Sequence, residues 1–179
     1  LILEYNSDER LFSVKEACQM ALKVLEALTA LQAQGIIHTN IKPENILIQI
    51  KTNPKTGALS RNVKITDIIA ASILGDDNIA PSPYRAPECR PEYQMMMIRG
   101  KEADVYSVGN ILYELLVGHP ATGTYLSPSQ CRDGLNSNID SIVDIALSPT
   151  PSDRYDTPKD MLNAIENSFS ESLQEEEPQ

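Results

Sequence analysis

The longest helical pattern in the chain lies between Ser13 and Gly35. Ser13 followed by Glu16 is the sequence signature of a capping box, and Gly35 is a typical stop after a helix. Apolar residues recur between them every three or four positions and so share one helix face: Val14, Ala17, Ala21, Leu25, Leu28 and Leu31. These features predict an amphipathic helix of about five turns.

Residues 104–117 show a different pattern, because apolar side chains occur on nearly every face of the predicted helix. This is typical of a helix buried on all sides, and Gly118 and Pro120 are expected to end it. A further amphipathic helix is predicted over 138–147.

The last predicted helix has a well-defined start, with Thr157 as cap, Pro158 in the first helical position and Asp160 in the first turn. Residues 170–179 are acidic and are expected to form a disordered tail. The apolar stripe of this helix consists of Met161, Leu162, Ile165 and Phe169.

Short runs of β-branched and aliphatic residues predict a small amount of sheet. Residues 46–50 and 63–66 read as two strands of a hairpin, joined by 51–62, which contains Asn-Pro and Thr-Gly turn signals. Residues 1–5 predict another strand, and 72–83, rich in Gly, Asp, Pro and Ser, predict irregular backbone. The expected fold is therefore mainly α-helical with a small β-hairpin.

Composition narrows the class of protein. A chain of 179 residues can bury a single core, and its formal charge of −10 argues against nucleic acid as a partner, since such a partner needs a basic face. No stretch approaches the roughly 18 consecutive apolar residues of a membrane span. The three cysteines are an odd number without a C-x-x-C pair, which favours a reducing, cytoplasmic compartment.

Polar residues are concentrated in the loop 36–48, between two apolar runs that are expected to be buried. His38, Lys42, Glu44 and Asn45 lie at short, fixed offsets in this loop. Polar side chains held by buried flanks are how a rigid scaffold presents a site at its surface, so the loop is the first candidate for function.

The spacing from His38 to Asn45 resembles the catalytic loop of eukaryotic-type protein kinases, H-R-D-x-x-x-x-N. Residues 1–169 resemble the large, mostly helical lobe of that α+β family, and the C-terminal third is most similar to bacterial Ser/Thr kinases. Several further motifs occur in the family's order: Leu3-Glu4-Tyr5 for the hinge strand, Asp67 for D-F-G, Ala86-Pro87-Glu88 for A-P-E, Asp104 to Gly109 for D-x-W-S-x-G, and Arg154.

The resemblance implies a nucleotide site built from five of these residues. Glu4 and Tyr5 would lie against the adenine, Lys42 would contact the γ-phosphate, and Asn45 and Asp67 would hold magnesium. The alternative for Asn45 and Asp67 is a structural role in which they cap the loop and the hairpin.

The resemblance also implies structural roles for four residues. His38 is expected to pack under the loop, and Asp104 to bond the loop backbone from the start of the buried helix. Glu88 and Arg154 are expected to form a buried ion pair.

The sequence departs from the family where the chemistry occurs. The catalytic aspartate, which accepts the substrate proton, is replaced by Asn40, and an amide cannot take a proton near neutral pH. Losing a positioned base costs roughly 10²–10⁴ in rate. Thr39 replaces the family's arginine, Asp67-Ile68-Ile69 lacks the glycine of D-F-G, and neither a G-x-G-x-x-G loop nor a V-A-I-K lysine occurs in the chain.

These departures predict a catalytically inactive kinase-like domain, a pseudokinase, that binds another protein as a scaffold or regulator and needs no cofactor. One alternative is a weak or atypical Ser/Thr kinase that holds Mg-ATP and whose small lobe lies upstream of Leu1. Another is a phosphoacceptor, in which Ser72 or Ser82 is modified by an active kinase.

Overall fold

The computed structural model describes residues 11–52, 56–57, 59–68, 82–90 and 100–175. Its elements, in chain order, are α2 (Val14–Gln32), η1 (Pro43–Asn45), β1 (Ile46–Thr52), β2 (Leu59–Ile65), η3 (Pro87–Cys89), α4 (Glu102–Val117), α5 (Pro128–Cys131), α6 (Ser137–Ala146), η5 (Pro151–Asp153) and α7 (Pro158–Glu175).

Helix α2 begins and ends as the sequence predicts. The Glu16 backbone N–H donates to Ser13 Oγ over 3.2 Å, and the Ser13 N–H donates to the Glu16 carboxylate over 3.1 Å, which completes the capping box. Gly35 has φ of 72°, a left-handed conformation that glycine adopts without a Cβ clash. The predicted helix is confirmed.

Helix α4 lies at the centre of the described fold. Every residue from 103 to 116 is buried, which explains why its sequence is apolar on all faces. Gly118 caps the helix with φ of 96°, and its N–H donates to the Glu114 carbonyl. The expectation of an internal helix ended by this glycine is confirmed.

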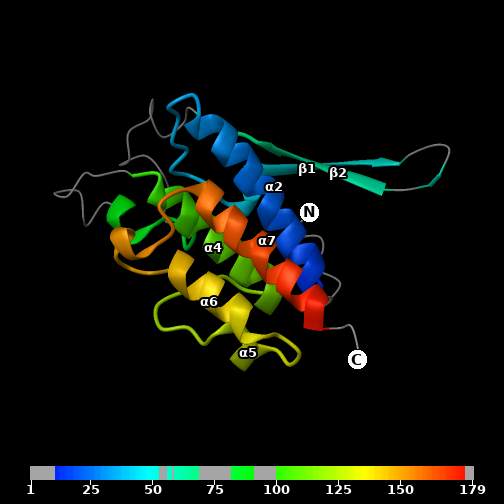
Figure 1. Ribbon diagram of the computed structural model, residues 1–179. Helices are drawn as coiled ribbons and strands as arrows, with labels where there is room; N and C mark the ends of the chain where they lie inside the picture. The colour runs from blue at the N-terminus through cyan, green and yellow to red at the C-terminus, as the bar shows by residue number, and fades with distance from the viewer. Residues whose placement is uncertain (1–10, 53–55, 58, 69–81, 91–99, 176–179) are drawn as a thin grey trace.

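The helices surround α4 in a compact body (Figure 1). Helices α2 and α7 lie side by side, α4 packs against both, and α6 packs against α4 and α7. Most of the buried apolar residues of the core come from the facing sides of these four helices. In consequence, the loop that follows α2 is brought against the start of α4.

Strands β1 and β2 form an antiparallel hairpin that projects from the helical body (Figure 1). Ile48 pairs with Val63, and both are partly buried against the core. Leu47 pairs with Lys64 on the opposite face, where Leu47 is 53% exposed. Both strands are longer than predicted, because backbone pairing continues through polar residues that carry no alternating apolar pattern.

The bounds of α6, α7 and the short helices agree only in part with the predictions. Helix α6 lies within one residue of the predicted range, and the Asn136 side chain caps it, which was not predicted. Helix α7 begins at Pro158 after the Thr157 cap, as expected. Helix α7 continues to Glu175, which is beyond residue 170, where the sequence predicts the tail to begin. The short helices, α5 among them, were not predicted.

Some predictions fall outside the described residues. These are the strand 1–5, the end of the tail at 176–179 and most of the segment 72–83. Over the part of the chain that is described, no helix has both the length and the apolar character needed to cross a bilayer.

Candidate functional site

Asp104, the third residue of α4, holds the backbone of the loop that follows α2. The His38 N–H donates to Asp104 Oδ2 over 2.9 Å, and the Thr39 N–H donates to Oδ1 over 2.7 Å. The carboxylate is fully buried, and burial raises its pKa while the two backbone bonds oppose that rise. One buried side chain therefore fixes two consecutive peptides of the loop.

His38 is fully buried and bonded through both ring nitrogens. Its Nε2 lies 2.9 Å from the Thr66 carbonyl oxygen, and the Asn40 N–H donates to Nδ1 over 3.3 Å. These partners fit the neutral tautomer with its proton on Nε2. With one nitrogen donating and the other accepting, the imidazole links the loop to the strand end after β2.

Asn45 joins the loop to the end of the hairpin. Its Nδ2 donates to the Asn40 carbonyl over 2.9 Å, and its own carbonyl accepts the Thr66 N–H over 2.9 Å. Asp67 follows Thr66 directly, so the structure brings Asn40, Asn45 and Asp67 to one end of the hairpin. The side-chain amide of Asn45 is therefore already used, at least in part, to hold the loop.

Two residues of this site adopt a left-handed backbone without being glycine. Thr39 has φ of 59° and Asp67 has φ of 61°. Such a conformation is uncommon for a β-branched residue and persists where surrounding bonds enforce it, as the Asp104 bond does for Thr39. Asp67, which matches the aspartate of D-F-G, has a positive φ. Ile69, which stands where D-F-G has its glycine, is outside the described residues.

Arg154 and Glu88 form a bidentate ion pair. Arg154 Nη1 lies 2.7 Å from Glu88 Oε1 and Nη2 lies 2.8 Å from Oε2. The same guanidinium donates to the Ser148 and Glu102 carbonyls and stacks 5.0 Å from the centre of the Tyr106 ring. The pair thus ties η3 to the start of α4 and to the loop before η5.

The segment 82–90 is attached to α4 by two further polar contacts. The Tyr84 hydroxyl donates to Glu114 Oε2 over 2.6 Å, and Asn110 Nδ2 donates to the Pro83 carbonyl over 2.7 Å. Burial is the main cause of the raised pKa of Glu114, and the Tyr84 hydroxyl opposes it.

This arrangement is matched by a known family. The sequence profile of the protein kinase domain matches residues 2–175. The chain belongs to the protein kinase domain family. The match covers nearly the whole chain.

Two curated relatives support this assignment. Serine/threonine-protein kinase PknB of Mycobacterium tuberculosis is 29% identical over 174 residues, covering 82% of this chain and 25% of that protein. The probable serine/threonine-protein kinase PknB of Corynebacterium glutamicum is 30% identical, covering 88% of this chain and 27% of its own length. The chain therefore spans about a quarter of the length of these curated relatives.

A solved structure shows the same fold. The crystal structure of the Mycobacterium tuberculosis PknI kinase domain superposes with a TM-score of 0.69 at 19% identity, covering 92% of this chain and 60% of that one. The described elements thus form a kinase-like large lobe, as the sequence predicted.

The kinase-like site is partly outside the described residues. Glu4 and Tyr5, the expected adenine contacts, belong to 1–10 and are not described. Lys42 precedes η1 in the described loop and is half-buried. Over the described ranges, no group of three or more His, Cys, Asp or Glu side chains gathers in a way that would hold a metal ion.

Proposed function

We propose that this chain is a catalytically inactive kinase-like domain, a pseudokinase, that acts in the cytoplasm by binding another protein. The observation that carries the proposal is the contrast around Asn40. The family's structural residues make complete sets of bonds, whereas an amide occupies the position where the reaction needs a base.

The bonding of the loop supports a structural role. Asp104 binds two loop peptides, His38 bonds through both nitrogens, and Asn45 donates its side-chain N–H to the Asn40 carbonyl. None of these contacts needs a substrate or a nucleotide to be complete. A loop held by such internal hydrogen bonds keeps its conformation whether or not the protein catalyses phosphoryl transfer.

A second candidate is a weak Ser/Thr kinase whose small lobe lies upstream of Leu1. Asn45 and Asp67 lie together at the end of the hairpin, which favours this candidate. Their side-chain oxygens, together with phosphate oxygens of ATP, could hold Mg²⁺. A G-x-G-x-x-G strand pair and a V-A-I-K lysine in the coding sequence upstream would distinguish this candidate.

Nucleotide binding tests the proposal in a single experiment. The melting temperature of the purified chain is measured with ATP, alone and with magnesium or manganese, and no shift is expected. A ligand present at 100 times its dissociation constant would stabilise the fold by about 2.7 kcal/mol. A shift that disappears in both N45A and D67A, but not in the surface control D133A, would overturn the cofactor-free proposal in favour of the second candidate.

A further inference from the structure

Charge is distributed unevenly in this acidic chain. Residues 46–65, which contain both strands of the hairpin, hold four of the 15 basic residues and none of the 25 acidic ones. The rest of the chain therefore carries a formal charge of −14. The hairpin is a local basic element on an otherwise acidic protein.

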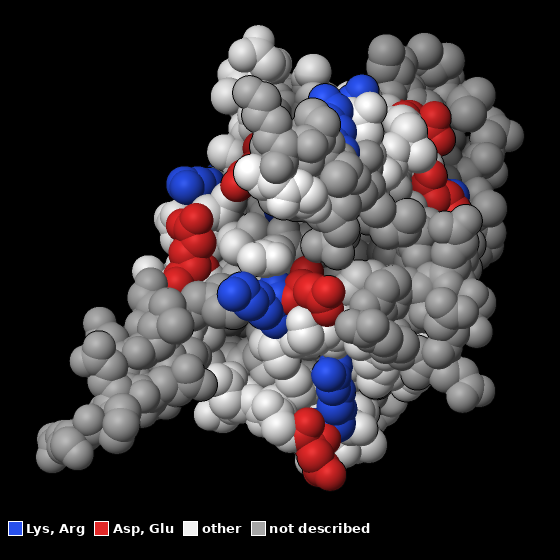
Figure 2. Space-filling model, turned by 90° about the vertical axis from the view of Figure 1, so that its right-hand side faces the viewer, with Lys and Arg blue, Asp and Glu red and all other residues white. Residues whose placement is uncertain are grey.

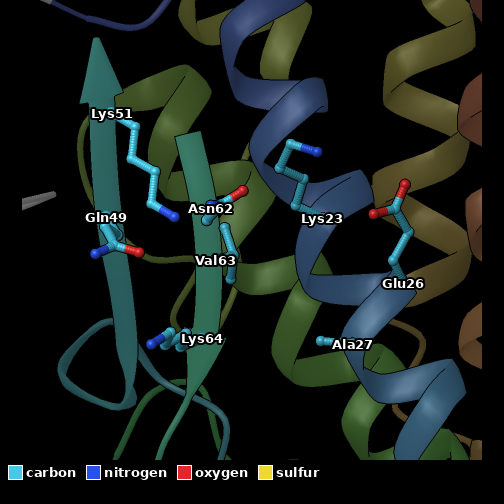
Figure 3. Close-up of a pocket in the computed structure, with 8 residues that line it drawn as sticks. All are labelled: Lys23, Glu26, Ala27, Gln49, Lys51, Asn62, Val63 and Lys64. Atoms are coloured by element: carbon cyan, nitrogen blue, oxygen red, sulfur yellow. The ribbon is translucent and has the colours of Figure 1, made fainter. Parts of the chain in front are cut away.

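The basic side chains of the hairpin continue onto α2 across a groove of about 540 Å³ (Figure 3). Lys51 on β1 and Lys64 on β2 line one wall, and Lys23 on α2 lines the other. In Figure 3, Lys51 extends across the hairpin towards Asn62. Three of the chain's eight lysines thus meet at one groove.

The groove contains little opposing charge. Glu26 is its only acidic lining residue, and its carboxylate points to the side of α2 away from the hairpin in Figure 3. Among the residues that the structure describes, no acid forms an ion pair with Lys23 or Lys64. Lys23 and Lys64 are both exposed, so they give the groove a positive charge that an anionic ligand could approach.

An exposed apolar residue lies next to one of these lysines, Lys64. Leu47 is 53% exposed and pairs across the hairpin with Lys64, on the face that also carries Gln49. A ligand that satisfies the lysines can therefore bury an aliphatic side chain on Leu47 in the same step.

The surroundings favour a short ligand over an extended polyanion. Basic and acidic side chains are interspersed over the face shown in Figure 2, without a broad field of one sign. Charges interact over roughly 10 Å at ordinary salt, so a nucleic acid or an anionic membrane would also meet the acidic remainder of the surface. A short acidic peptide would meet only the groove.

We propose that the groove between α2 and the hairpin binds an acidic peptide segment of a partner protein, with an aliphatic side chain of that segment on Leu47. This inference rests on the binding role in the proposed function and specifies the chemistry of the partner. It involves neither Asn40 nor a nucleotide.

The test is fluorescence anisotropy with a short labelled peptide of glutamate and leucine, titrated with the full chain. Reversing two groove charges in K23E/K64E is expected to weaken binding by about tenfold or more, and K23R/K64R is expected to retain it. The control K15E/K159E makes the same change of charge on exposed lysines of α2 and α7 outside the groove and is expected to bind as the wild type does. L47S is expected to weaken binding several-fold.

Four results would overturn the proposal. They are no binding by the wild type, equal binding of a peptide with glutamine in place of glutamate, equal losses in K23E/K64E and K15E/K159E, or tighter binding of a DNA oligonucleotide than of the peptide. Because no nucleotide is present, failure here leaves catalytic inactivity untouched. Conversely, phosphoryl transfer by the protein would overturn the proposed function without affecting the groove.

Discussion

Asp104 holds the backbone of the loop 36–48 through two hydrogen bonds. Both of its carboxylate oxygens accept backbone N–H groups, from His38 and Thr39, in a fully buried position. An amide at this position offers one acceptor oxygen and turns a donor towards the second N–H, which is then unsatisfied.

The first prediction is that D104N lowers the free energy of unfolding by about 2 kcal/mol, the typical cost of a buried donor without an acceptor. Urea unfolding followed by circular dichroism measures it. D133N, the same substitution at an exposed loop position, should change stability by less than about 0.5 kcal/mol. Equal values for the two variants would show that Asp104 does not hold the loop.

Glu114 gives a prediction for pH. Burial raises the pKa of this carboxyl above its unfolded value, so the folded state favours the protonated form. The stability that the group contributes is therefore fully present below the unfolded pKa of about 4.3 and is lost as the pH rises through the folded pKa.

The second prediction compares the wild type with E114Q, which keeps an acceptor for the Tyr84 hydroxyl and does not titrate. The stability of the wild type relative to E114Q should fall as the pH rises from about 4 to about 7. Urea unfolding at several pH values measures this difference, with E26Q on the exposed face of α2 as control. A difference that stays constant or rises with pH would contradict the assigned direction of the shift.

At this scale the sequence predicted some contacts and missed others. The bonds from Asp104 to the loop backbone and the ion pair of Glu88 with Arg154 were expected, and the structure contains them. The motif order singled out His38, Asp104, Glu88 and Arg154, because their spacing matches a known family. The bonds between Asn45 and Asn40 and between His38 and Thr66 depend on loop geometry that spacing alone does not contain. The hydroxyl bond from Tyr84 to Glu114 was not foreseen either, because no motif of the resemblance assigns a contact to either residue.

At the scale of the elements, Gly109 of α4 lies in close contact with α6. A Cβ built on Gly109 would lie 2.6 Å from Ala146 Cβ, a distance at which one helix has to move. Alanine is the better helix former by about 1 kcal/mol, but overpacking a tight core costs about 1–3 kcal/mol.

The third prediction is that G109A destabilises the fold by about 1–2 kcal/mol despite its gain in helix propensity. Thermal and urea unfolding measure the change. The double variant G109A/A146G, which removes the opposing methyl, should be more stable than G109A alone. A stabilising effect of G109A, or no recovery in the double variant, would show that the helices are not in close contact there.

The sequence predicted helices better than strands or short turns. The capping box at Ser13 and the all-round apolar pattern of α4 are strong local signals, and both elements were confirmed. The hairpin was predicted too short because its outer ends are polar, and α5 has only four residues, too few for a periodic pattern to emerge.

Across the whole molecule, the described elements form a kinase-like large lobe, and the proposed loss of catalysis rests on Asn40, which the sequence resemblance assigns to the position of the catalytic base. The composition indicates an acidic protein with a formal charge of −10. The basic groove was missed because net charge averages over the chain, although the absence of acidic residues from 46–65 was visible in the sequence.

Phosphoryl transfer tests this account most directly. The protein, produced at its natural length, is incubated with radiolabelled ATP, magnesium or manganese and a Ser/Thr peptide substrate, beside the variants N40A and D67A. Because Asn40 cannot accept the substrate proton, the wild type is expected to transfer no more phosphate than either variant. Transfer by the wild type that N40A abolishes would contradict the account.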